Sequence, residues 1–147
     1  MQFDNVEIRE IIYQTKEYDR SLVLRDKILR KPLGLSLFDE NLQREIDDWH
    51  LGAFQGEDLV GILILTKRDR GCVQMRQVAV DDFCRGMGIG SRLVSFSEKF
   101  AQSRGIKKIV LHARKAAIAF YDKMGYMTIG DEFTEVGIVH RGMVKLL

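Results

Sequence analysis

The spacing of hydrophobic residues changes along the chain, and the first third predicts one strand followed by a helix. The segment Ile8–Gln14 is short and rich in Ile, which is typical of a strand. In Tyr18–Leu29 apolar residues stand among charges at helical spacing, and the only proline and a glycine then end the pattern. Leu35–Asp48 is less regular, although Asp39 could cap a short helix that continues through Arg44.

The middle of the chain has the pattern of successive strands. His50–Phe54, Leu59–Thr66 and Cys72–Val80 are apolar segments separated by polar turns that contain glycine. Short strands joined by such turns pair with their neighbours in antiparallel order, so we expect an antiparallel meander here.

The spacing then becomes helical again over Gly88–Arg104, where an apolar stripe predicts an amphipathic helix. A short buried strand follows at Lys108–His112, and Lys115–Met124 predicts a second, shorter helix. The segments Tyr126–Ile129 and Ile138–Leu147 are expected to be closing strands. This order of elements indicates a mixed α/β fold around one central sheet.

Composition limits what such a chain can be. Its 147 residues, 46% hydrophobic and 30% charged, suit one globular domain over 1–147. The formal charge of +2 is nearly balanced, which argues against a dedicated nucleic-acid binder.

Cysteine and histidine usage predicts neither a metal site nor a disulfide framework. Cys72 and Cys84 form no CxxC pair, and the three histidines are scattered along the chain. The N-terminal residues contain charges and lack a signal-peptide core, and no apolar run approaches the roughly 20 residues of a membrane span. We therefore expect a cytoplasmic protein that does not associate with membranes.

The clearest candidate for chemistry is a glycine-rich loop between a strand and a helix. Val78–Val80 ends the strand, and Arg85-Gly86-Met87-Gly88-Ile89-Gly90 opens the long helix. Glycines there let the backbone turn tightly, and the unpaired amides of a helix start can bind pyrophosphate. Arg85 would add a full positive charge at the rim.

Other interpretations of this loop fit less well. A Walker loop needs Gly-Lys-Ser/Thr after its second glycine, and a dinucleotide fingerprint belongs to the first strand–helix unit of its fold. The remaining alternative is a tight connection that binds no ligand.

The loop resembles the [Arg/Gln]-x-x-Gly-x-Gly/Ala signature of the GCN5-related N-acetyltransferases, the GNAT family. Ala119-Phe120-Tyr121-Asp122-Lys123-Met124-Gly125-Tyr126 is similar to the second signature of that family. Leu24-Arg25, Arg30-Lys31-Pro32-Leu33-Gly34 and the segment Phe133–His140 resemble its ElaA-like bacterial branch. The resemblance implies a GNAT fold, with a mixed, mostly antiparallel sheet of about seven strands flanked by about four helices.

The resemblance also implies acetyl-CoA as co-substrate, no metal, and a cleft between two splayed strands. Pantetheine would pair with the end of the strand like an added strand, and a backbone N–H near Val78 would stabilise the oxyanion. The expected cofactor-binding residues are Val78, Ala79, Val80, Arg85, Gly86, Met87, Gly88, Ile89, Gly90 and Ser91. His112-Ala113-Arg114 stands where many relatives carry an asparagine that touches the cofactor, so that contact is not expected here.

Three residues are candidates for proton transfer. Tyr121 matches the position of a general-acid tyrosine in the family, and a phenol remains protonated at pH 7. Its alternative role is a core aromatic. Glu135 and His140 are candidate general bases, and the alternatives are a solvated loop acid and a strand histidine bonded to backbone.

The acceptor side is much less defined. Arg25 could pair with an anionic substrate, although a surface arginine is the simpler interpretation, and Cys84 is expected to pack rather than react. We predict an enzyme that transfers acetyl directly from acetyl-CoA to a primary amine of a small molecule, peptide or protein, and polyamines, amino acids, aminoglycosides and protein N-termini or lysines all remain open as acceptors. The alternative is a non-catalytic acyl-CoA-binding or sensor module on the same fold. The edge of the final strand could support a homodimer.

Overall fold

The computed structural model describes residues 5–84 and 86–147, and these form one seven-stranded sheet with the order β1-β2-β3-β4-β5-β7-β6. The strands are β1 (Val6–Ile11), β2 (Trp49–Gln55), β3 (Asp58–Lys67), β4 (Cys72–Val80), β5 (Lys108–Arg114), β6 (Met127–Glu135) and β7 (Ile138–Leu146). Only the pairing of β4 with β5 is parallel, so the expected mixed, mostly antiparallel sheet and the meander are confirmed.

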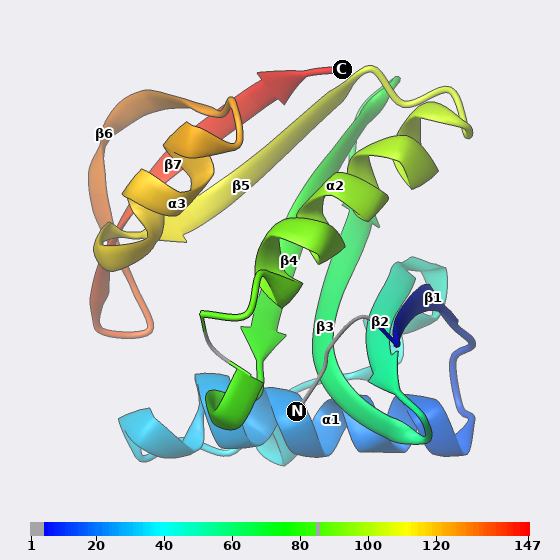
Figure 1. Cartoon of the computed structure of the whole chain (residues 1–147). Helices are drawn as coiled ribbons and strands as arrows, with labels where there is room; N and C mark the ends of the chain where they lie inside the picture. Colours follow the sequence, from blue (N-terminus) through cyan, green and yellow to red (C-terminus); the bar gives the residue numbers. More distant parts are fainter. Residues whose placement is uncertain (1–4, 85) are drawn as a thin grey trace.

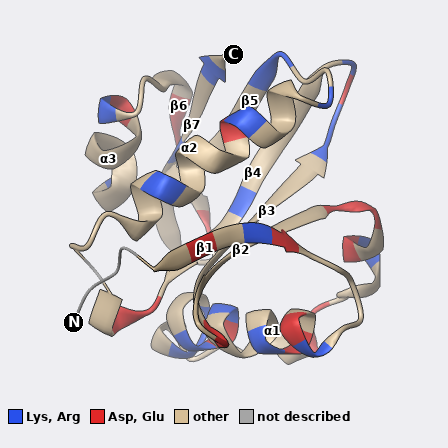
Figure 2. Ribbon diagram, turned by 45° about the vertical axis from the view of Figure 1, so that its right-hand side comes forward, with Lys and Arg blue, Asp and Glu red and all other residues tan. Residues whose placement is uncertain are grey.

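Helices cover both faces of this sheet. The described residues contain three α-helices, α1 (Lys16–Leu29), α2 (Ile89–Gln102) and α3 (Ile118–Lys123). Figure 1 shows α1 running across one side of the sheet, α2 lying along β4 on the other, and α3 beside β6 and β7. Charges of both signs are distributed along α1 (Figure 2), which leaves its apolar side for the sheet.

The short helix expected between Asp39 and Arg44 is not formed. The segment Leu35–Asp48 contains two short 3-10 turns, at Leu37–Asp39 and Gln43–Asp47. Ser36, rather than Asp39, caps the first of these turns. Its hydroxyl accepts a hydrogen bond of 3.3 Å from the backbone N–H of Phe38. Lys115–Met124 likewise begins as a 3-10 turn and becomes α-helical only at Ile118.

Two apolar clusters fix the layers. The larger cluster packs α2 and α3 against one face of the sheet, and the smaller cluster, which includes Ile62 and Ala79, packs α1 against the other face. Side chains of a strand alternate between the faces, so β4 contributes to both clusters. This arrangement leaves the second halves of β4 and β5 between the two layers, where the site lies.

Candidate active site

A cleft opens where β4 and β5 diverge. Their parallel pairing joins Cys72–Met75 to Lys108–Leu111 and stops there, although both strands continue for several residues within the described chain. Beyond the paired part lies a cleft of about 560 Å³, and Figure 1 shows the two strands separating toward this end. The divergence expected from the family resemblance is thus present in the structure.

A kink in β4 sits at the start of the cleft. Gln77 has a φ of 56°, which is unusual for a residue other than glycine, and the register between β3 and β4 shifts opposite it. An irregularity of this kind bends a strand locally. Val78–Val80 follow the kink directly and line the cleft.

The glycine-rich loop continues from Val80 into α2. Arg85 lies outside the described residues. Gly86 and Gly88 have φ of 79° and 77°, and a Cβ at either would meet no atom within 4 Å. These two glycines are therefore required by backbone conformation, not by crowding.

The start of α2 offers backbone donors. Gly88 caps the helix without a side-chain hydrogen bond. Within the described chain, the amides of Gly90 and Ser91 have no hydrogen-bond acceptor. Unpaired amides at a helix start carry a partial positive charge and favour an anion. The start of α2 therefore presents unpaired backbone donors, and phosphate binding there stays a prediction.

Tyr121 both packs in the core and lines the cleft, so its two predicted roles are compatible. It is 7% exposed, and its ring lies 5.0 Å from that of Phe120 and 5.7 Å from that of Tyr126, measured between centroids. Burial raises the pKa of Tyr121 to about 12. The phenol therefore stays protonated at neutral pH and can act only as a proton donor there.

His140 lines the same cleft from β7 and is 4% exposed. Its Nδ1 lies 2.8 Å from the carbonyl oxygen of Ile138, and because a carbonyl only accepts, Nδ1 must carry the proton. In the neutral ring the other nitrogen, Nε2, then has its lone pair and can accept a proton.

Glu135 lies at the exposed mouth of the cleft. Its carboxylate is 3.0 Å from Nδ1 of His112, and both side chains are substantially exposed. The structure thus brings Glu135, His140 and Tyr121 to one cleft. The contact with His112 was not predicted, because residues 112 and 135 lie far apart in sequence.

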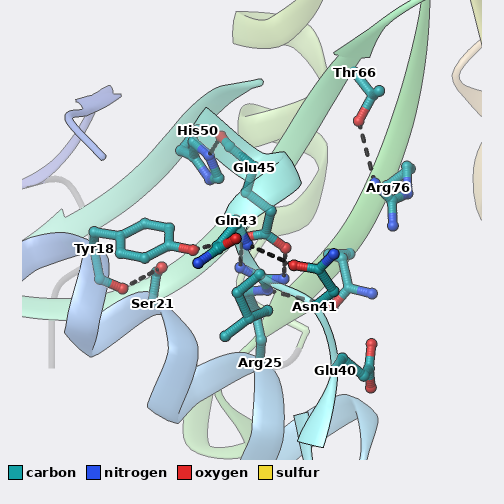
Figure 3. Close-up of polar contacts among 12 residues, drawn as sticks. Tyr18, Ser21, Arg25, Glu40, Asn41, Gln43, Glu45, His50, Thr66 and Arg76 are labelled. Atoms are coloured by element: carbon teal, nitrogen blue, oxygen red, sulfur yellow. Dashed lines mark hydrogen bonds and ion pairs between the residues drawn. The ribbon is translucent and has the colours of Figure 1, made fainter. Parts of the chain in front are cut away.

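The interpretation of Arg25 as a surface residue is wrong. Arg25 is 1% exposed, and its guanidinium donates to both carboxylate oxygens of Glu45 at 2.9 and 2.6 Å. The hydroxyl of Tyr18 also donates to Glu45, at 2.8 Å (Figure 3). Because this guanidinium is buried and its charge is paired with Glu45, Arg25 is not positioned to bind a substrate anion.

One further hydrogen bond connects the buried pair of Arg25 and Glu45 to a residue that lines the cleft. The Nε of Arg25 donates to Oε1 of Gln77, the kink residue of β4, at 3.3 Å. Burial acts to raise the pKa of Glu45, but the hydrogen bond and charge of Arg25 outweigh it, so the pKa is lowered on balance. Arg25 and Glu45 therefore support the strand that carries Val78.

Three cleft arginines, Arg30, Arg76 and Arg114, were not singled out as site residues from the sequence. A signal existed for the last two, because a charged residue within an apolar strand, such as Arg76, or at its end, such as Arg114, needs a polar environment. Cys84, by contrast, packs as expected: it is 1% exposed, and burial raises the pKa of its thiol.

Metal ligands and membrane spans are not found among the described residues. No group of three or more His, Cys, Asp or Glu side chains in this part of the chain could hold a metal ion. No helix there is long and apolar enough to cross a membrane.

Fold and cleft together are those of an acyl-CoA-dependent acyltransferase. The sequence matches the model of the Acetyltransferase (GNAT) family over residues 11–126, and the chain belongs to this family. The GNAT fold predicted from the two signatures is therefore confirmed.

Named relatives agree with this assignment. The uncharacterized N-acetyltransferase YjcF of Bacillus subtilis is 28% identical over 83% of this chain and 87% of its own length. Other curated acetyltransferases match over 43 to 49% of their own length.

Solved structures show the same fold. Escherichia coli ElaA superposes with a TM-score of 0.82 at 20% identity, covering 95% of this chain and 99% of ElaA. An acyl-CoA N-acyltransferase from Pseudomonas aeruginosa gives 0.83 at 23% identity, with the same coverage.

Proposed function

We propose that the protein transfers an acetyl group from acetyl-CoA to a primary amine of a small molecule or peptide, directly within a ternary complex. The observation that carries this proposal is the cleft between β4 and β5, which gathers the kinked strand end, Tyr121 and His140. Family membership supports an acyl-CoA donor.

The donor would bind along the strand end and the loop that follows it. Beyond Met75 the edge of β4 that faces β5 has lost its partner strand, so its backbone can pair with the amide groups of pantetheine. The pyrophosphate would lie on the amides between Arg85 and Ser91, with Arg85 as an added cation. The conformation of Gly86 and Gly88 supports this binding mode.

The transfer needs a neutral amine, an oxyanion site and a proton for the leaving thiolate. The amine nitrogen attacks the thioester carbon, and a backbone N–H near Val78 stabilises the negative charge that develops on oxygen. The intermediate then collapses: the C–S bond breaks and the thiolate takes the phenolic proton of Tyr121. The products are the amide and the free thiol of CoA.

The proton that the amine loses goes to a base in the cleft, directly or through water. Hydrogen bonding favours His140 over Glu135, because Nε2 of His140 has a lone pair while Glu135 contacts His112. Proton exchange with solvent then restores His140 and Tyr121 for the next turnover.

Release of CoA thiol from acetyl-CoA, measured with a panel of amines, tests the proposal. We expect turnover with at least one amine, and initial-rate lines that intersect, as for a ternary complex. His140→Ala should lower kcat and change its pH profile, whereas Arg70→Gln, on an exposed turn, should change neither. Acetyl-CoA binding without turnover of any amine would instead favour the non-catalytic module.

The two cysteines support a reducing compartment, and we propose the cytoplasm. Both are free and buried, and neither forms a disulfide.

A further inference from the structure

The cleft between β4 and β5 carries an excess of positive charge. Among the residues that the structure describes, its lining includes Arg30, Arg76 and Arg114 but only one carboxylate, that of Glu135. The two strands that flank the cleft, β4 and β5, contain basic residues and no acidic ones, as Figure 2 shows.

Two of these charges are already paired within the protein. Arg30 forms an ion pair with Glu40, with 2.7 Å between Nε and a carboxylate oxygen. Glu135 contacts His112. Arg76 and Arg114 are therefore the cleft arginines whose charge could meet a ligand.

Arg76 and Arg114 have few partners. Within the described chain, no carboxylate oxygen lies within 4.0 Å of either guanidinium. Arg76 donates to the hydroxyl of Thr66 at 3.3 Å, and Arg114 donates to the carbonyl of Leu29 at 3.4 Å. Both are neutral acceptors, so most guanidinium donors of the two arginines remain available.

This arrangement costs free energy in the absence of a ligand. Both side chains are half-buried. The charge of Asp48 acts on Arg76 from beyond ion-pair distance, whereas Arg114 has no carboxylate partner among the described residues. A partly desolvated charge without a counter-ion is unfavourable, so the cost falls mainly on Arg114. Burial and the nearby Arg30 lower the pKa of Arg114, which indicates the same strain. An anion held by both guanidinium groups would relieve it.

The position of Arg114 links it to the reaction. It stands directly opposite His140 in the antiparallel pairing of β5 and β7, so the two side chains project from the same face of the sheet. A group bound by Arg114 would thus lie within a few bonds of an amine that loses its proton to His140.

We propose that the amine acceptor carries an oxyanion group, a carboxylate or a phosphate, that Arg114 and Arg76 bind. The acceptor is a small molecule with amine and anion a few bonds apart, such as an amino acid or a phosphorylated amino alcohol. Polycationic amines are disfavoured, because the same arginines repel them. This inference rests on the proposed function and names the substrate class of the same site.

Matched acceptors test it, because they differ only in the anion. Pairs suited to this are β-alanine with β-alaninamide, and phosphoethanolamine with ethanolamine, compared at equal concentrations of free amine, with spermidine as the polycation. Calorimetry on the CoA-bound protein gives the affinity, and thiol release gives the acceptor KM. At least one anionic member should bind about 10- to 100-fold more tightly than its neutral partner, and the pair that responds identifies carboxylate or phosphate.

Variants then assign the preference to the cleft. Arg114→Gln and Arg76→Gln should each remove most of the preference and leave the KM for acetyl-CoA unchanged. Arg114→Lys should keep part of it, and Arg70→Gln all of it. Thermal unfolding of each variant shows whether it is folded.

Several outcomes would overturn the inference: equal binding of the members of both pairs, tighter binding of spermidine, or an effect of Arg114→Gln on acetyl-CoA alone. The last would mean that the arginines serve the donor. Failure of the proposed function can be distinguished from these outcomes. In that case no amine causes release of CoA thiol, whereas calorimetry still measures whether the anionic member of each pair binds more tightly than the neutral one.

Discussion

Replacing Glu45 by Gln should be among the most destabilising single changes in this protein. Arg25 and Glu45 are 1% and 5% exposed, and they are joined by two hydrogen bonds of 2.9 and 2.6 Å. The substitution keeps the shape of the side chain and removes its charge. The guanidinium of Arg25 is then left buried without a counter-ion.

The magnitude follows from that burial. Removing one partner of a buried ion pair costs about 3–5 kcal/mol, because the remaining charge stays desolvated. For a domain of this size, each kcal/mol lowers Tm by about 2–4 °C, so the expected decrease is about 6–20 °C. Support for the kink at Gln77 should weaken as well, since Arg25 donates to its side chain.

Urea unfolding and thermal unfolding, followed by circular dichroism, measure this effect. Glu40→Gln is the matched control, because Glu40 pairs with Arg30 but its side chain is 43% exposed, and its loss should cost about 1 kcal/mol or less. Replacing both Arg25 and Glu45 by Met should restore much of the stability, since no unpaired charge remains. A Glu45→Gln variant within about 1 kcal/mol of the parent would refute the reasoning.

Three further predictions concern catalysis, cofactor binding and pH. Tyr121→Phe should lower kcat by about 10²- to 10⁴-fold with little change in acetyl-CoA affinity, as steady-state kinetics and calorimetry can show. Gly88→Ala should weaken acetyl-CoA binding because of its φ of 77°, whereas Gly90→Ala, whose Cβ would meet its nearest atom at 3.6 Å, should bind normally. The free energy of unfolding should fall as pH drops below about 6.5, by up to about 1.4 kcal/mol per pH unit, and His50→Gln should reduce that slope.

The sign of the pH effect follows from His50. Burial lowers its pKa from the ordinary 6.5, so between the lowered value and 6.5 the unfolded chain binds a proton that the folded chain does not. Stability is therefore present above this window and is lost as pH falls through it. A profile that is flat between pH 7 and 5, or one that His50→Gln leaves unchanged, would contradict this assignment.

An unchanged kcat in Tyr121→Phe would show that Tyr121 has only a structural role. Equal losses of affinity in Gly88→Ala and Gly90→Ala would show that backbone conformation is not what the loop requires.

The connection between β4 and α2 could be predicted because its signal is local. The loop from Val78 to Gly90 joins a strand to a helix within a few residues, and Gly86 and Gly88 have a positive φ, which glycine adopts readily. The predicted limits of the long helix, Gly88–Arg104, were also close to those of α2, because its apolar stripe is continuous.

The acceptor side could not be predicted in the same way. Burial of Arg25 depends on Glu45, which lies in a 3-10 turn of an irregular segment, and periodicity gives no indication of that contact. The pairing of β7 between β5 and β6, which brings His140 opposite Arg114, is likewise a long-range contact. Because β7 is paired on both sides, the expectation that the edge of the final strand could support a homodimer is wrong, and the edge strand is β6. β6 also extends to Glu135 rather than ending at Ile129, so part of the cleft mouth was expected to be loop.

The most direct test of the central claim is a crystal structure with CoA bound. We predict that pantetheine lies between the diverging ends of β4 and β5 and pairs with the backbone of Val78–Val80, with the pyrophosphate on the amides of residues 85–91. The thiol would then lie near the hydroxyl of Tyr121. A CoA molecule bound elsewhere, with the space between β4 and β5 empty, would contradict the claim.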